Sequence, residues 1–131
     1  FRPFIVNQGV NMIEIDVSMA GGLLEAKKIA DLAETYYIPV CTHNVASPIA
    51  TIASANWAST VREFVAHETF IMNPTNRAGR GVNGDPDILG YDKEMIVKGH
   101  LQLSDRPGFG FDLNEKLIRE KYMVEGETWW K

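Results

Sequence analysis

The 131-residue chain holds 13 Lys and Arg against 17 Asp and Glu, a net charge of −4 at pH 7. Hydrophobic residues make up 45% and charged residues 23%, a composition typical of a folded globular domain and not of a disordered or membrane-spanning chain. The mild acidity, together with the lack of a Lys/Arg cluster, argues against a partner that is a nucleic acid or an anionic membrane.

The single cysteine, Cys41, lies in the apolar run 38–41 and has no partner for an internal disulfide. We therefore expect a small buried thiol in a reducing compartment, and a cytoplasmic protein. The sequence begins at Phe1 without an initiator Met and shows no targeting segment. This start predicts a processed or truncated chain.

Residues 1–69 alternate between short apolar runs and helical patterns. Strands are expected at 11–16, 38–42 and 64–67. A helix is expected at 23–36, where apolar residues recur every three or four positions, and a second from Pro48 to about residue 59, with Ser47 as its N-cap. The short connections predict parallel strands covered by helices, an α/β fold.

Residues 70–131 have a different texture. Asn, Gly, Pro and Asp dominate 73–90, which predicts a long loop. The remaining segments are expected to be a strand pair or one extended strand at 94–103, a turn at 106–110 and a weak helix at 113–122. Because three strands and two helices make an incomplete layer, we expect the chain to be part of something larger.

Three ionisable residues, Asp16, His43 and Glu68, follow the three predicted parallel strands. In parallel α/β folds the carboxyl ends of the strands carry ligands and catalytic side chains. A carboxylate beside an imidazole can orient it and support a general base, and a third acidic group can hydrogen-bond a developing oxyanion. The repetition on consecutive strands indicates a catalytic site.

Each residue also has a simpler interpretation. Asp16 is suited to capping the turn at 17–22, and His43 to bonding the backbone inside the fold. Glu68 would then be a solvated carboxylate near Arg62 or Arg77. The three together are also compatible with a metal site of oxygen and nitrogen ligands, and spacing alone does not separate that from an acid/base pair.

Other polar features are weaker candidates. His67 adjoins Glu68, but neighbouring strand residues point to opposite faces of a sheet. His100 lies in the tail, where a structural role is expected. The Gly21-Gly22 pair before a helix is suited to holding an anion, although a tight turn is the commoner use of such a pair.

With these residues in view, the sequence resembles the C-terminal part of the enolase superfamily, in the mandelate racemase/muconate lactonizing enzyme group. The resemblance lies in several motifs that occur in the family's order. They are 13–23, 25–34, 38–44, the segment that closes on His67-Glu68, and the glycine-rich stretch 106–112.

The resemblance implies a (β/α)₇β TIM-type barrel with an α+β capping domain, of which 1–69 would supply units 6 to 8 and 70–131 a tail returning to the cap. Such barrels take about 250 residues. It implies that Asp16 and His43 form the acid/base dyad and that Glu68 binds the substrate carboxylate.

The implied chemistry is abstraction of the proton alpha to a carboxylate, with Mg²⁺ stabilising an enediolate. The family's Mg²⁺ ligands lie on earlier strands, so no metal ligand is expected in this chain. The His43-Asn44 pair and the bulky end at 122–130 are most similar to acid-sugar dehydratases, with a racemase, epimerase or cycloisomerase as alternatives. A third alternative is that the chain is a non-catalytic fragment. We expect the chain alone to be inactive. We also expect the protein to form a homo-oligomer.

Overall fold

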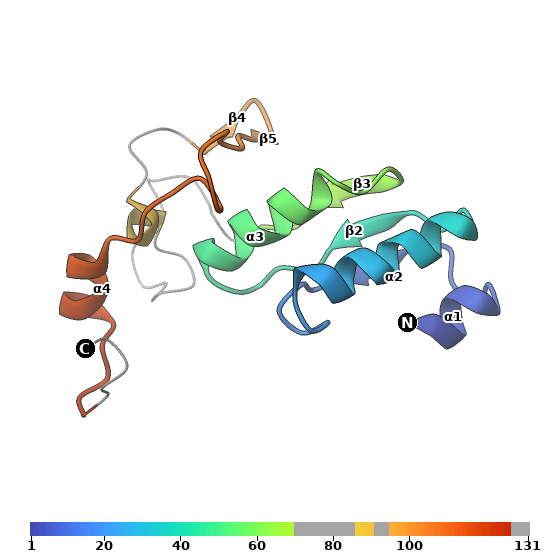
Figure 1. Ribbon diagram of the computed structural model, residues 1–131, viewed down its shortest axis with the longest axis horizontal. Coiled ribbons are helices and arrows are strands. Elements are labelled where there is room, and N and C mark those ends of the chain that lie inside the picture. Colours follow the sequence, from blue (N-terminus) through green and yellow to red (C-terminus); the bar gives the residue numbers. More distant parts are fainter. Residues whose placement is uncertain (70–85, 91–94, 127–131) are drawn as a thin grey trace.

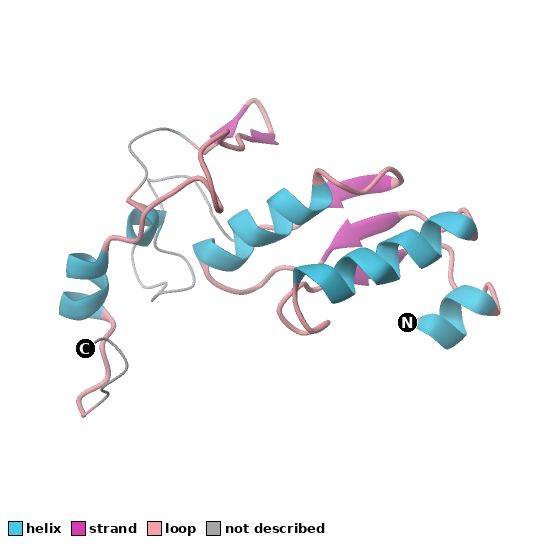
Figure 2. Cartoon of the chain, in the orientation of Figure 1, coloured by secondary structure: helices cyan, strands magenta, loops and turns pink. Residues whose placement is uncertain are grey.

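Three parallel strands form the sheet that carries the candidate site. They are β1 (Ile13–Ile15), β2 (Val40–Thr42) and β3 (Phe64–His67), in that spatial order (Figures 1 and 2). The computed structural model, which describes residues 1–69, 86–90 and 95–126, confirms the predicted alternation of strands and helices. The first two strands are shorter than predicted, because apolar runs locate a strand better than they locate its ends.

Helices α2 (Leu23–Thr35) and α3 (Pro48–Ala58) cover one face of this sheet (Figure 1). Helix α2 follows Gly22, whose φ of +100° is a conformation that favours glycine, so the Gly pair forms a turn as its commoner use predicts. Helix α3 begins as predicted, since the Ser47 hydroxyl accepts a hydrogen bond from the N–H of Ala50. A short helix, α1 (Arg2–Val6), precedes β1.

The main core lies between the sheet and these helices. The side chains of β1 alternate between the two faces of the sheet. Ile13 and Ile15 are buried against the helices, and Glu14 is exposed on the other face. Helix α2 contributes a stripe of buried alanines whose small side chains let it pack closely on the strands. The stripe is Ala26, Ala30 and Ala33.

The described tail packs on the first part of α3 and forms a second apolar cluster. Ile52 of α3 contacts a group of buried residues contributed by the tail, which are Ile88, Leu89 and Met95. The tail contains a 3-10 helix, η3 (Pro86–Leu89), a hairpin of β4 (Ile96–Val97) and β5 (His100–Leu101), and α4 (Glu115–Lys121).

The structure resolves one ambiguity in the tail and corrects one expectation. Residues 94–103 contain an antiparallel strand pair and not one extended strand. The expected loop 73–90 ends in η3, because Ile88 and Leu89 are buried apolar residues that fix this turn on α3. The rest of that loop, at 73–85, and the bulky end beyond residue 126 lie outside the described residues.

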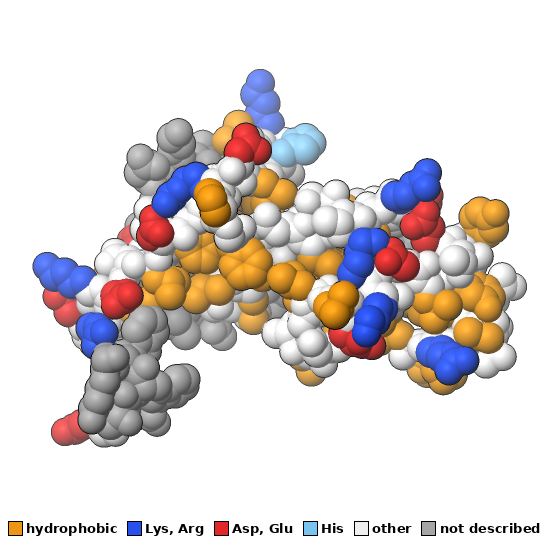
Figure 3. Space-filling view, viewed as in Figure 1, with side chains coloured by type: hydrophobic (Ala, Val, Ile, Leu, Met, Phe, Trp, Pro, Cys, Tyr) orange, Lys and Arg blue, Asp and Glu red, His pale blue; other side chains and the backbone are white. Residues whose placement is uncertain are grey.

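The face of the sheet opposite α2 and α3 has little cover from the described residues. Glu14 and Val65 are exposed there, Val65 to 59%. Further exposed apolar side chains lie on α1, including Phe4 at 61%, and Figure 3 shows apolar surface over this helix and along the junction of α3 with the tail. None of the helices within the described ranges is long and apolar enough to cross a membrane.

Candidate active site

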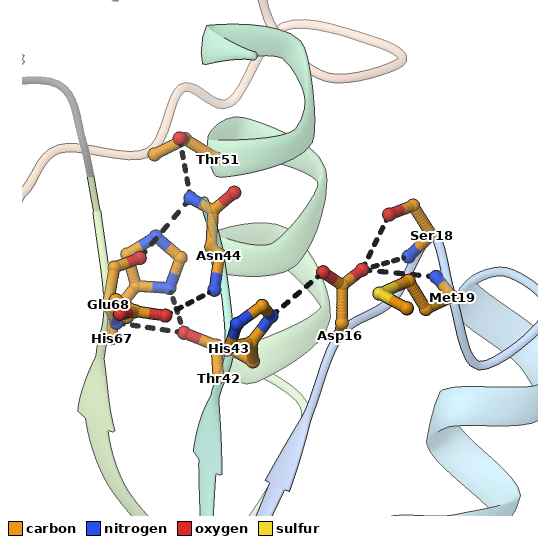
Figure 4. A network of polar contacts seen from close by, with 9 residues as sticks. All are labelled: Asp16, Ser18, Met19, Thr42, His43, Asn44, Thr51, His67 and Glu68. Carbon is orange, nitrogen blue, oxygen red and sulfur yellow. Dashed lines mark hydrogen bonds and ion pairs between the residues drawn. The ribbon is translucent and has the colours of Figure 1, made fainter. Parts of the chain in front are cut away.

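The register of the sheet brings the three predicted site residues to one edge. Ile15 lies opposite Thr42, and Thr42 lies opposite His67. The residues that follow, Asp16, His43 and Glu68, therefore leave the carboxyl ends of β1, β2 and β3 at the same level (Figure 4). This is the arrangement that consecutive parallel strands predict.

Asp16 and His43 form a direct contact. The distance between His43 Nδ1 and Asp16 Oδ2 is 3.0 Å. Because a carboxylate only accepts hydrogen bonds, Nδ1 of His43 carries the proton. In the neutral ring Nε2 is then unprotonated, and no hydrogen bond from the described residues occupies it. The pair can therefore present a base at Nε2.

The other oxygen of Asp16 organises the turn that follows β1. Asp16 Oδ1 accepts hydrogen bonds from the Ser18 hydroxyl at 2.5 Å, the Ser18 N–H at 2.8 Å and the Met19 N–H at 3.1 Å. Capping and dyad formation were alternatives at the level of sequence, yet the carboxylate does both, one with each oxygen. Burial acts to raise the pKa of Asp16, but the bonds from Ser18, His43 and Met19 outweigh it and hold this pKa below its usual value.

The imidazole of His43 is accessible from the site, with 37% of its side chain exposed. The hydrogen bond to Asp16 is the main reason that the pKa of His43 lies above its usual value, and desolvation opposes it. The negative charges of Glu68, Asp16 and Glu14 add to the increase. The ring can therefore receive a proton and hold it as a stabilised imidazolium.

Glu68 is held in place by backbone and side-chain contacts. Its Oε2 accepts the N–H of Asn44 at 2.6 Å, and its own N–H donates to the Thr42 hydroxyl at 3.0 Å. No hydrogen bond from the described residues occupies Oε1. The guanidinium of Arg62 pairs instead with Glu34, at 3.4 Å, and Arg77 lies outside the described residues. An ion pair with Arg62 therefore does not explain Glu68, although the residue is exposed to solvent as the simpler interpretation expected.

Behind the site lies a buried polar network that sequence reasoning did not select. Asn44 Nδ2 donates to the Thr51 hydroxyl at 2.6 Å and to the carbonyl of Glu68 at 3.2 Å (Figure 4). Asn44 is 1% exposed and Thr51 is fully buried. Among the residues outside the predicted site that contact Asp16 or Glu68, only Ser18 had a local signal in the sequence, since a hydroxyl two residues after an Asp is typical of a capped turn. The contacts of Asn44 join β2, α3 and β3, which no local pattern reveals.

His67 lies on the face of β3 opposite to Glu68 and contacts Thr42 at the end of β2. The Thr42 hydroxyl accepts the N–H of Glu68 and lies 2.9 Å from His67 Nδ1, to which it can donate its own proton. Desolvation is the main cause of the low pKa of His67, and the charge of Glu68 opposes it only in part. His67 is therefore neutral and belongs to the support of the sheet, as its face predicts.

His100 and Cys41 take no part in the row of site residues. The Nδ1 atom of His100 bonds the Lys98 carbonyl at 3.0 Å, a local contact in the tail hairpin. Cys41 is a free, buried thiol, as expected, and its sulfur lies 3.6 Å from the Ile13 carbonyl and 3.5 Å from Glu14 Oε1. Burial first, and then the Glu14 carboxylate, raise the pKa of Cys41 to about 11.

The described residues do not by themselves provide a metal site. No group of three or more His, Cys, Asp or Glu side chains within the described ranges is placed to hold a metal ion. Asp16 uses both of its oxygens in hydrogen bonds, and Glu68 uses one. Among the described residues, an acid/base pair beside a carboxylate fits the three site residues better than a metal triad does.

Residues 1–117 match the sequence family described as Enolase C-terminal domain-like, and the chain belongs to this family. The D-xylonate dehydratase of Haloferax volcanii is 38% identical over 97% of the chain, which corresponds to 28% of that enzyme. The D-gluconate/D-galactonate dehydratase of Picrophilus torridus is 32% identical over 96% of the chain and 30% of the enzyme. The chain therefore spans less than a third of these relatives.

Solved structures agree with this assignment. A mandelate racemase/muconate lactonizing enzyme-like protein from Rubrobacter xylanophilus superposes with a TM-score of 0.79 at 34% identity, over 99% of this chain and 31% of that one. An enolase from Pantoea ananatis, with bound D-gluconate and Mg, has a TM-score of 0.75 at 27% identity, over 97% and 28% of the two chains. The predicted superfamily is confirmed, and the chain is a partial TIM-type barrel of helices on a parallel sheet.

Proposed function

We propose that this chain supplies the acid/base half-site of an acid-sugar dehydratase. The single observation that carries the proposal is the contact of 3.0 Å between His43 and Asp16, beside Glu68, at the carboxyl ends of three parallel strands. Relatives named as dehydratases of D-xylonate, D-gluconate and D-galactonate support an acid sugar as the substrate class.

Each site residue has a role that follows from its contacts. His43 Nε2 is the free base, because Asp16 holds the proton on Nδ1. Asp16 keeps the ring oriented and stabilises the imidazolium that forms when Nε2 accepts a proton. Glu68 presents a carboxyl oxygen to the substrate carboxylate; a proton shared between the two acids would avoid their repulsion.

The proposed reaction begins when His43 Nε2 removes the proton alpha to the substrate carboxylate. The electron pair of the C–H bond then forms a C=C bond to the beta carbon, and the beta C–O bond breaks. The hydroxyl leaves as water with the proton that His43 returns, and the resulting enol becomes a 2-keto-3-deoxy acid. No oxidant or reductant is needed.

A Mg²⁺ ion is part of this proposal only as a group held outside the described residues, which lack a metal site of their own. The Pantoea ananatis structure with D-gluconate and Mg supports its presence in the complete site. We accordingly expect the chain by itself to show no turnover, as a non-catalytic fragment would. A cytoplasmic location and a homo-oligomeric state remain predictions.

The test uses a chimera in which this chain replaces the matching segment of the Haloferax volcanii D-xylonate dehydratase. We expect the chimera to exchange the alpha proton of D-xylonate in D₂O and His43→Asn to abolish the exchange. His100→Asn, in the tail hairpin, is the matched control and should leave exchange intact. Equal exchange with and without His43 would refute the dyad.

Product analysis separates dehydration from the alternatives on the same scaffold. Dehydration yields a 2-keto-3-deoxy acid, which carbonyl reagents detect. A racemase or epimerase would instead return an acid sugar of inverted configuration at the alpha carbon. A cycloisomerase, which closes a lactone without loss of water only by adding a carboxyl group across a C=C bond, would leave the acid sugar unchanged. Chiral chromatography of the product distinguishes these outcomes.

A further inference from the structure

Glu68 is held by a residue adjacent to the proposed base. We propose that Asn44 is a positioning residue that, with Thr51 behind it, fixes the carboxylate of Glu68 relative to His43. The positioning follows from contacts in the structure, and its importance for catalysis rests on the proposed function.

Three hydrogen bonds fix Glu68 from the side of β2. The Asn44 N–H donates to Glu68 Oε2 at 2.6 Å, and Asn44 Nδ2 donates to the Glu68 carbonyl at 3.2 Å. The Glu68 N–H donates to Thr42 Oγ1 at 3.0 Å. The backbone of Glu68 is thus held at both its N–H and its carbonyl, and the side chain is held at its end. The other carboxyl oxygen, Oε1, has no hydrogen bond from the described residues, which leaves it available to a substrate.

The amide of Asn44 is itself fixed by Thr51 on the first turns of α3. Asn44 Nδ2 lies 2.6 Å from Thr51 Oγ1, and that hydroxyl lies 3.4 Å from the carbonyl of Ser47, the N-cap of α3. Both Nδ2 protons of Asn44 therefore have acceptors, which sets the orientation of its amide. Asn44 and Thr51 are almost completely buried, so water does not compete for these bonds.

The consequence for catalysis comes from chain connectivity. His43 and Asn44 are consecutive residues, so one peptide segment carries the base and the clamp on Glu68. Fixing residue 44 against both α3 and Glu68 therefore fixes the spacing between the base and the group that binds the substrate carboxylate. Catalytic groups need such spacing to hold within a fraction of an ångström.

The first experiment uses the 131-residue chain and needs no activity. In ¹H–¹⁵N NMR spectra across a pH series, the amide proton of Asn44 should shift as the Glu68 carboxylate titrates. Glu68→Gln should abolish this response. An Asn44 amide that responds equally with and without Glu68 would overturn the proposal, whatever the chain catalyses.

The side-chain part of the clamp is tested with matched variants in the same experiment. Thr51→Val keeps the shape of the residue and removes the acceptor, so the response of the Asn44 amide to Glu68 should weaken. Thr51→Ser keeps the hydroxyl and should restore it. Asn44→Ala keeps the backbone N–H but loses both Nδ2 bonds, without adding a titrating group, and should weaken the response as well. Equal responses in Thr51→Val and Thr51→Ser would contradict the role of Thr51.

The second experiment places the variants in the dehydratase chimera. Thr51→Val should lower kcat/KM by about 10- to 100-fold, by analogy with residues that orient the ligands of a metal site. In a Glu68→Gln background the same substitution should have little further effect, because the group it positions is already altered. Independent, additive losses would overturn the proposal. If His43→Asn leaves exchange intact while the NMR coupling holds, the proposed function fails and the positioning of Glu68 stands.

Discussion

The Nδ1 atom of His43 and the Oδ2 atom of Asp16 lie 3.0 Å apart, although 27 positions separate the two residues in the sequence. The contact arises because β1 and β2 are parallel neighbours whose last residues, Ile15 and Thr42, are in register. It couples the charge state of the imidazole to that of the carboxylate. The first prediction concerns this coupling, and the second concerns the other contacts of Asp16.

Asp16→Asn should lower the pKa of His43, since the bond to Asp16 is the main cause of its elevation above 6.5. A pKa raised in the folded state contributes stability below the unfolded pKa, and this contribution is lost as pH rises through the folded pKa. The substitution should therefore flatten the fall in stability that the original chain shows as pH rises from 6.5 through the raised pKa of His43. NMR titration of the ring signals checks it, with His67 as the internal control. An unchanged His43 titration would contradict the contact.

Ser18→Ala removes one of the hydrogen bonds to Asp16 Oδ1 and keeps the backbone donors of Ser18 and Met19. We expect a loss of about 1 kcal/mol in the free energy of unfolding at neutral pH. The lowered pKa of Asp16 means that its charged form stabilises the fold above the unfolded pKa of 3.8, and that this stabilisation disappears as pH falls through the folded value.

The difference between Ser18→Ala and the original chain should therefore shrink in acid. Denaturant titrations at pH 7 and at the lowest pH where the chain remains folded measure this. Ser18→Thr, which retains the hydroxyl, is the control. A loss of the same size at both pH values would show that the carboxylate is not the partner that matters.

Cys41 should resist modification in the folded chain. The residue is 6% exposed, and burial together with Glu14 raises its pKa to about 11, so almost no thiolate is present at pH 8. A thiol-reactive disulfide reagent should react slowly in buffer and rapidly in denaturant. Glu14→Gln, which removes the neighbouring charge, should lower the thiol pKa. Fast labelling of the native chain would contradict the burial.

Gly110→Ala should destabilise the tail, because an added Cβ would lie 2.4 Å from Ser104 Cβ at a φ of +81°. Gly108→Ala is the matched control, with φ of +69° and no atom within 4 Å of the added Cβ. The control should cost about 1 kcal/mol for the left-handed backbone, and Gly110→Ala roughly 1–3 kcal/mol more for the steric clash. Chemical denaturation compares the two variants. Ser104→Gly removes the Cβ that clashes, so it should relieve the steric cost of Gly110→Ala and leave the backbone cost of both variants unchanged.

The local sequence was sufficient to predict the three strands and the two long helices of residues 1–69, but not the short helix α1. Periodicity and capping depend on neighbours within a few positions, and Ser47-Pro48 or the alanine stripe of α2 encode helices wherever they lie. Strand ends were less accurate, because hydrogen bonding across the sheet decides which apolar residues pair. The turn η3 was missed because its burial depends on α3, which lies far away in the sequence.

The sequence also predicted that Asp16, His43 and Glu68 form a site, because ionisable residues at the ends of successive parallel strands meet at one edge of the sheet. Tertiary structure alone decided how they are used. The register of β1 and β2 places Asp16 so that one carboxylate oxygen bonds the turn and the other bonds His43. The packing of α3 buries Asn44 and Thr51 behind Glu68. Such contacts depend on distances between segments remote in sequence, and only the folded chain fixes those distances.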